Sequence, residues 1–442
     1  MIGKSKIYVF SYFKELFLTV FCSIFAFFSL CSYYSIVESD IFAYLNRPTL
    51  PDKQIIYFLP IIPLVILGAI IIFLKKKSHL SVMLDYLFVF YLIPSFIISS
   101  AHKDQKDWIF ECVLKFIVFI IFSVTIGNKE HVNIQENFNK KSLYKYSYPA
   151  IVLIVVTILG YNLTTVAFDL NRVYEVRFAA RDLSSGGNSL SDHSPNFLIY
   201  FFGPILISIG VGLKKKLVFI LGLFSMILPF MAIASKSAIF LLGIAFFVGL
   251  VYNKIFKYRH WHLPAIMILL IGIAQSAYVY FDDFWLPSFF SRMFIIPSIS
   301  TEYYIEFGNI RGFYYFEDWN IISNFYDLLG ISKSFSDSKG FVIGNEYYSG
   351  NLVNLNSTIW ANAYLDFGFL GVVIFTILFA LILRMLTPRK DDSRVDKLAK
   401  IVIMYVYTYL SLEKSANGYI LGAGLVFAFL YYLSSHFKIL ER

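Results

Sequence analysis

Long apolar stretches recur along the whole chain and are separated by shorter polar segments. A helix that crosses a bilayer needs roughly 20 mostly apolar residues. Such stretches predict twelve membrane-spanning helices, at about 15–36, 55–74, 81–100, 108–127, 147–166, 196–213, 217–234, 237–253, 263–282, 359–383, 398–412 and 418–435. The pattern therefore predicts an all-α polytopic membrane protein in which residues 1–442 form a single integral membrane domain.

The composition agrees with this fold class. Hydrophobic residues make up 58% and charged residues 15% of the 442 positions, which excludes soluble enzymes and disordered chains. The three cysteines, Cys22, Cys31 and Cys112, lie within apolar stretches, so we expect packing residues rather than disulfides. The net charge of +9 is typical of cytoplasmic loops and predicts no nucleic-acid partner.

Basic residues fix the orientation. With the N-terminus inside, the inner loops and both termini hold 24 Lys and Arg residues, whereas the longer outer loops hold 13. Positive charge gathers on the cytoplasmic side of membrane proteins. We therefore expect both termini in the cytoplasm of a bacterial inner membrane. The apolar run at 15–36 is longer than a signal-peptide core and should remain as the first span.

Two outer loops are long, at 167–195 and, between spans nine and ten, at 283–358, which places any soluble chemistry outside. The second loop interleaves aromatic residues, Tyr303 and Tyr304 among them, with Asn, Ser, Gly and acidic residues. Aromatic faces beside polar groups suit sugar rings. An equally weighted alternative is that these rings form an interfacial belt and pack the loop.

Three arginines lie in the first outer loop, in the run NRVYEVRFAARD: Arg172, Arg177 and Arg181. In a helix Arg177 and Arg181 share one face, and a guanidinium forks onto phosphate oxygens. The run therefore predicts an anion site, and its alternative is local pairing with Asp169, Glu175 and Asp182.

Two further cations are candidates for anion binding. Arg292 stands alone in the apolar, aromatic run PSFFSRMFIIPS, a costly position unless it meets an anion. Lys236 lies in the short outer turn between two spans, at the depth of lipid phosphates. Its alternative is ordinary contact with lipid headgroups.

Candidate bases are the carboxylates Glu302, Asp282 and Asp283, and His193 in the first outer loop. Glu302 is the best placed of these, because it follows Arg292 among aromatic residues. Glu111 and Lys115, four apart in a span, predict a structural ion pair with no assigned role. No nucleotide-binding, zinc-protease or CxxC motif occurs, so we expect no cofactor and no metal. The alternative is that Asp282 and Asp283 hold a divalent cation on a diphosphate.

The chain resembles the Wzy-type polymerases of bacterial O-antigen or oligosaccharide repeat units over most of its length. Four stretches carry the resemblance: NRVYEVRFAARD, IASKSAIFLL, SRMFIIPSISTEYYIEF and NSTIWANAYLDFGFLGVVI. It implies a GT-C-like glycosyltransferase architecture, similar to that of lipid-linked glycan ligases.

The resemblance also implies a reaction at the outer face of the membrane. The growing glycan on undecaprenyl diphosphate is transferred to the next lipid-linked repeat unit of an O-antigen or capsule. By matching motif, Arg172, Arg177, Arg181 and Arg292 become the diphosphate ligands, because charge develops on that leaving group. Lipids and a chain-length regulator complete the expected partners.

Two other readings of the sequence stay open. A flippase of lipid-linked oligosaccharides would have similar size and composition, but the nearly uncharged spans and the long outer loop favour an enzyme. An O-antigen ligase is disfavoured because ligases use a histidine in the large loop, which has none here. A sugar or proton-coupled transporter is a weaker third, since no internal hydropathy repeat is visible.

Overall fold

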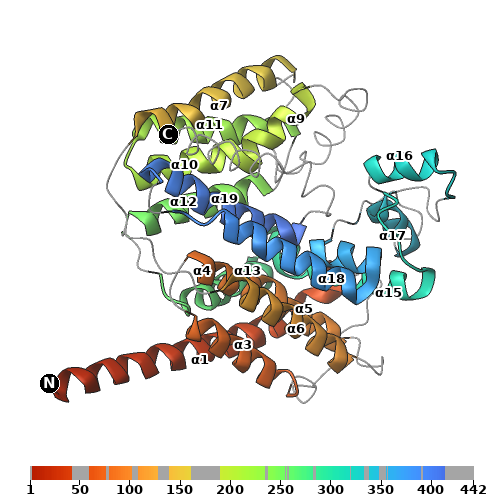
Figure 1. The fold of residues 1–442 in the computed structure, drawn as a ribbon. Helices are drawn as coiled ribbons and strands as arrows, with labels where there is room; N and C mark the ends of the chain where they lie inside the picture. The colour runs from red at the N-terminus through yellow and green to blue at the C-terminus, as the bar shows by residue number, and fades with distance from the viewer. Residues whose placement is uncertain are drawn as a thin grey trace. The chain divides into compact units, whose positions relative to one another are not determined.

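The computed structural model consists of helices, turns and connecting segments wherever it describes the chain, with no β-strand in that part (Figure 1). The described residues are 2–41, 59–75, 79–101, 108–127, 139–160, 190–233, 237–253, 255, 258–281, 285–318, 320–332, 338–347, 355, 357–389 and 392–413. The helices are α1 (Ile2–Ile41), α3 (Ile62–Leu74), α4 (His79–Leu87), η2 (Phe88–Leu92), α5 (Ile93–Ala101), α6 (Trp108–Ile126), α7 (Lys140–Gly160), α9 (Leu190–Phe197), η5 (Leu198–Phe202), α10 (Gly203–Gly212), α11 (Lys216–Ile233), α12 (Ser237–Tyr252), α13 (His262–Phe281), α14 (Trp285–Phe294), α15 (Ile296–Arg311), α16 (Asn320–Leu328), α17 (Lys339–Tyr347), α18 (Ile359–Met385) and α19 (Arg394–Glu413).

Eight of the described helices are long and apolar enough to cross a membrane. The chain is therefore an all-helical, multi-pass membrane protein, and the count of twelve spans stays a prediction. Two of the other predicted spans correspond to the shorter apolar helices α3 and α12. The stretch at 398–412 lies in α19, which is not among the eight, and 418–435 lies outside the described residues.

The chain divides into two packed units. Unit 1 comprises 1–130, 259–381 and 411–416, and unit 2 comprises 131–258, 382–410 and 417–442. Within unit 1, α1 packs on α3 and α13, and α5 packs on α6 and α15. Within unit 2, α10 packs on α11 and α12, and α7 packs on α9 and α11. The four helices described within 283–358, α14 to α17, belong to unit 1.

In the described part of each unit, one deeply buried helix contains a π-helical turn. The turns are η2 in unit 1 and η5 in unit 2. Pro94 and Pro204 follow these turns at the same distance. Proline has no N–H to donate to the carbonyl four residues earlier, and a π turn shifts the hydrogen-bonding register there. The two prolines explain why both helices change their winding at this point.

The most consequential element is α18, which is two helical arms rather than one straight span. Phe367 (φ −143°, ψ 24°) and Gly368 (φ 61°, ψ −150°) break it. Trp360 donates a hydrogen bond from Nε1 to Thr376 Oγ1 at 3.0 Å, although a straight helix would separate these residues by about 24 Å. The first arm, 359–366, therefore folds back along the second, 369–385. The prediction of one continuous span at 359–383 was wrong in this respect.

Candidate functional site

Several predicted site residues lie outside the described part of the chain. They are Arg172, Arg177, Arg181, Lys236, Asp282 and Asp283. Arg292 lies on α14, where the structure describes the backbone alone. His193 lies on α9 in unit 2 and is exposed. The diphosphate ligands therefore stay predictions.

Helix α15 holds the remaining predicted site residues, Glu302, Tyr303 and Tyr304. Pro297 stands in its first turn, where a missing N–H is harmless. Gly312, at φ +95°, ends the helix in a conformation that favours glycine. Between these ends most side chains are buried, including several polar ones. A helix from the segment 283–358 is thus enclosed by other helices of unit 1.

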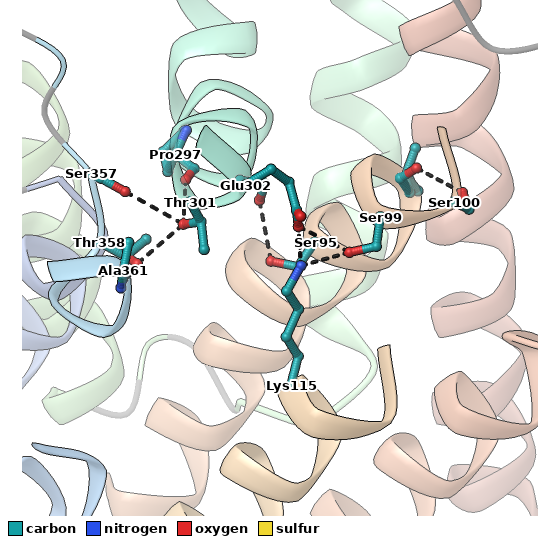
Figure 2. A network of polar contacts seen from close by, with 12 residues as sticks. Ser95, Ser99, Ser100, Lys115, Pro297, Thr301, Glu302, Ser357, Thr358 and Ala361 are labelled. Carbon is teal, nitrogen blue, oxygen red and sulfur yellow. Dashed lines mark hydrogen bonds and ion pairs between the residues drawn. The ribbon is translucent and has the colours of Figure 1, made fainter. Parts of the chain in front are cut away.

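Glu302 forms a buried ion pair with Lys115 of α6. The lysine also donates to Ser99 Oγ at 2.6 Å, and Ser99 Oγ in turn donates to Glu302 Oε1 at 3.0 Å. Figure 2 shows Glu302 pointing from α15 toward these two side chains. A charge removed from water needs a partner and further hydrogen bonds, and this arrangement supplies both. Glu302 and Lys115 leave 6% and 7% of their side-chain surface exposed.

Glu111 stands one helical turn before Lys115 and completes this group. It interacts electrostatically with both Lys115 and Glu302. Its Oε2 is buried and accepts no hydrogen bond from the residues that the structure describes. We call Ser99, Glu111, Lys115 and Glu302 the Lys115 cluster. It holds two carboxylates and one ammonium group, an excess of one carboxylate in a place with little water.

The cluster corrects one expectation. Glu111 and Lys115 were expected to pair with each other, but the direct partner of Lys115 is Glu302, 187 positions away in the sequence. A second buried charge lies on α4, where an Asp85 carboxylate oxygen is 2.9 Å from His260 Nδ1. Local sequence cannot reveal this contact, because the two residues lie far apart in the chain.

The neighbouring face of α15 contacts the start of α18. Thr301 Oγ1 lies 3.2 Å from Thr358 Oγ1 and 3.5 Å from Ser357 Oγ, and Figure 2 shows Thr301 pointing away from Glu302 toward them. Thr358 caps the first arm of α18 by accepting a hydrogen bond from the Ala361 N–H at 3.1 Å. Adjacent residues of α15 therefore join the Lys115 cluster to the folded-back arm.

Tyr303 and Tyr304 are both buried, with 4% and 1% exposure. The Tyr303 ring packs on Tyr347 of α17 with centroids 4.3 Å apart. Tyr304 donates from its hydroxyl to the Leu355 carbonyl at 2.8 Å, and burial raises the pKa of that hydroxyl far above its usual range. These contacts favour the alternative that the two rings pack the loop, while sugar binding by them stays a prediction.

A second buried charge group holds the large loop on α18. Lys339, the first residue of α17, places Nζ 2.7 Å from Asp366 Oδ1 and 2.9 Å from Asp318 Oδ1. Asp366 also accepts the Phe316 N–H at 2.9 Å. Phe316 has a positive φ of 65°, which is rare for a bulky residue. The carboxylate at the break of α18 therefore stabilises a strained turn of the loop.

Sequence reasoning did not single out Lys339, Asp366 or Ser99 as members of charged groups. Asp366 did carry a signal, because an acidic residue inside an apolar stretch predicts a buried partner. Among the described residues, no three His, Cys, Asp or Glu side chains gather closely enough to hold a metal ion. That the reaction needs no metal ion stays a prediction.

The comparisons with known proteins give no relatives. No family model, curated protein or solved structure matches this chain.

Proposed function

We propose that this chain is a polymerase of lipid-linked oligosaccharide repeat units, a glycosyltransferase acting at the outer face of a bacterial inner membrane. One observation supports it most strongly: α15 of the large outer loop is enclosed among helices of unit 1 and brings Glu302 to Lys115. An enclosed charged group on an outer loop suits chemistry that must exclude water. The resemblance to Wzy-type polymerases points to the same reaction.

In the proposed reaction, a hydroxyl of the acceptor repeat unit attacks the anomeric carbon of the donor glycan. The bond from that carbon to undecaprenyl diphosphate breaks, and the diphosphate leaves with the electron pair. Arg177 and Arg292 are the proposed ligands of this leaving group, with Arg172, Arg181 and Lys236 as additional anion contacts. Guanidinium groups suit this task because they stay charged and bind two phosphate oxygens at once.

Replacing either proposed arginine by alanine should shorten the surface polymer severely. Loss of one contact to a developing anion costs on the order of 3 kcal/mol, about a hundredfold in rate. We expect Arg177→Ala and Arg292→Ala to leave mainly single repeat units, and the lysine variants to give shorter chains than wild type. The measurement is the electrophoretic ladder of surface polymer at matched membrane levels.

Arg311→Ala is the matched control for these variants. Arg311 lies on α15 but is exposed and pairs with Glu346 on the surface, where an ion pair is worth little. Its ladder should equal that of the wild type. Normal ladders from both Arg177→Ala and Arg292→Ala would remove the leaving-group argument and with it the main chemical support for a polymerase.

A flippase of lipid-linked oligosaccharides is the second candidate function. The observations that favour it are the charges buried inside spans, Asp85 and Lys115, and the broken helix α18. Transporters often use such broken helices and buried ionisable groups. The resemblance and the enclosed outer loop place this candidate behind the polymerase.

Deletion of the gene should distinguish the two functions. Loss of a polymerase should leave one repeat unit on the surface anchor, because units still reach the outer face. Loss of a flippase should leave none. The glycan attached to the surface anchor, resolved by electrophoresis, gives the answer, and a strain restored with the wild-type chain controls for effects on neighbouring genes.

A further inference from the structure

Helix α16 of unit 1 and the residue after it have an apolar side and a polar side. Apolar residues recur at helical spacing on one side: Ile322, Phe325, Leu328 and Leu329. Polar residues lie on the other side: Ser323, Asn324 and Asp327. Phe325, Leu328 and Leu329 leave 56%, 81% and 55% of their surface exposed. Adjoining apolar side chains left open in this way mark a surface that contacts a partner or a membrane.

The end of α16 adds another apolar side chain to this side. Gly330, at φ 65°, donates its N–H to the Asp327 carbonyl at 3.2 Å, and the Ile331 N–H donates to the Tyr326 carbonyl at 2.9 Å. This pair of bonds is a Schellman motif, which returns the residue after the glycine to the last helical turn. Ile331 is also exposed. The α16 apolar face is defined by four residues: Phe325, Leu328, Leu329 and Ile331.

The α16 apolar face is joined to the exposed side of α18, which is a candidate membrane span. Tyr326 donates from its hydroxyl to the Tyr315 carbonyl at 3.0 Å. The Tyr315 ring in turn packs on Phe367, at the break of α18, with centroids 5.6 Å apart. Exposed apolar residues then continue along the second arm of α18: Leu370, Ile374, Ile377, Leu378 and Leu381. The exposed side of a membrane span meets lipid, so the apolar surface runs from α16 to the lipid-facing side of α18.

Asp366 holds both ends of the α16 region beside the break of α18. Its carboxylate accepts the Phe316 N–H, which precedes α16, at 2.9 Å. It also lies 2.7 Å from Nζ of Lys339, which follows α16. The break is where the second arm of α18 begins, so α16 is kept near one end of a span. Tyrosine rings such as those of Tyr315 and Tyr326 suit this level, because an apolar ring and a polar hydroxyl match a membrane interface.

A second copy of the chain is a poorer occupant of this surface. Helix α16 has nine residues and is therefore about 14 Å long. A stable protein interface buries roughly 800 Å² on each partner, which one side of so short a helix cannot supply. The bilayer, by contrast, already covers the adjoining side of α18.

We propose that α16 is an interfacial helix, which lies along the membrane surface with its apolar face among the lipid acyl chains. Its polar side, with Ser323 and Asn324, faces water. The predicted topology makes this the outer leaflet. The helix thereby fixes the segment 283–358 to the lipid surface at a point beside the break of α18. This inference goes beyond the proposed function and does not depend on it, because it concerns how the segment meets the membrane.

The test places a fluorescent label on each side of α16 in the full chain. Leu329→Cys puts the label on the apolar face, and Asn324→Cys puts it on the polar side, five positions away and about 140° around the helix. Each variant is labelled with the NBD fluorophore and reconstituted, one copy per disc, in nanodiscs of phosphatidylethanolamine and phosphatidylglycerol. The wild-type chain, treated alike, gives the background from the three native cysteines.

The label of Leu329→Cys should emit at shorter wavelength than that of Asn324→Cys, because its surroundings contain less water. A phospholipid that carries a spin label close to its headgroup should quench it several-fold more than it quenches Asn324→Cys. Iodide in the buffer should show the opposite order. Leu370→Cys, on the exposed side of α18, is the reference for lipid contact and should be quenched by the spin-labelled lipid as Leu329→Cys is. Unchanged size-exclusion profiles show that the labelled variants remain folded.

Three outcomes would overturn the inference. Equal, strong quenching of Leu329→Cys and Asn324→Cys by iodide would show that water covers both sides of α16. Weak quenching of Leu329→Cys by both iodide and spin-labelled lipid would show that another segment of the chain covers the apolar face. Access of iodide to Leu329→Cys in single-copy discs, lost in discs that hold two copies, would assign the face to self-association. None of these outcomes bears on the polymerase, which the ladders of the arginine variants test separately.

Discussion

Replacing Lys115 by methionine should destabilise the protein by about 3 kcal/mol, because it leaves the Glu302 carboxylate buried without its ion-pair partner. Methionine has a similar length and packs well in apolar surroundings, so the loss reports the charge rather than a cavity. Thermal unfolding of the purified protein in detergent, followed by size-exclusion chromatography after heating, measures the effect. A lower apparent melting temperature than wild type is the expected result.

The double variant Lys115→Met, Glu302→Gln is the control for this prediction. A neutral amide in place of the carboxylate removes the unpaired charge, so the double variant should recover much of the lost stability. A double-mutant cycle then isolates the energy of the pair. Equal stability of Lys115→Met and wild type would show that Glu302 is neutral or paired elsewhere, and the geometry of the Lys115 cluster would need revision.

Replacing Gly371 by alanine should also be strongly destabilising, by roughly 3 kcal/mol, because α18 folds back on itself there. A Cβ atom on Gly371 would lie 2.2 Å from the carbonyl oxygen of Ala363. That oxygen belongs to the backbone of the first arm and cannot turn aside. The arm would have to move away from the second, which would stretch the hydrogen bond from Trp360 to Thr376. The same heating assay measures the loss.

Gly272→Ala is the matched control on a candidate span. Gly272 lies on α13, and a Cβ atom there would meet no atom within 4 Å. Alanine also has the better helix propensity, so stability should stay equal or rise slightly. If Gly371→Ala proved as stable as Gly272→Ala, the two arms of α18 could not pack as closely as the structure has them, and a straight span would be the better description.

The class of protein could be predicted from the sequence because membrane helices are specified locally. A run of about 20 apolar residues predicts a span whatever the rest of the chain does, and all eight candidate spans overlap a predicted one, such as 108–127. The break in the span at 359–383 escaped prediction because local composition carries no signal for it. The run at 359–383 is apolar throughout, and nothing in its composition reveals the reversal at Phe367 and Gly368, since glycine is common inside spans.

Helix α15 shows why the candidate site was only partly predictable. Its sequence, IPSISTEYYIEFGNIR, is too polar for a span and was assigned to the outer loop. Its burial depends on partners from other parts of the chain, Ser99 and Lys115 for Glu302, and Thr358 for Thr301. These partners supply hydrogen bonds that offset the free-energy cost of burying a polar helix.

What the sequence by itself determined is therefore the all-helical membrane architecture, while a chemical role of Glu302 stays a prediction. The tertiary structure alone decided that Lys115 pairs with Glu302 rather than with Glu111, four residues away on its own helix. Helical spacing brings Glu111 and Lys115 within reach of each other, but α15, which lies within 283–358, brings a buried carboxylate to Lys115. The ion pair forms with that carboxylate because a charge removed from water needs a partner.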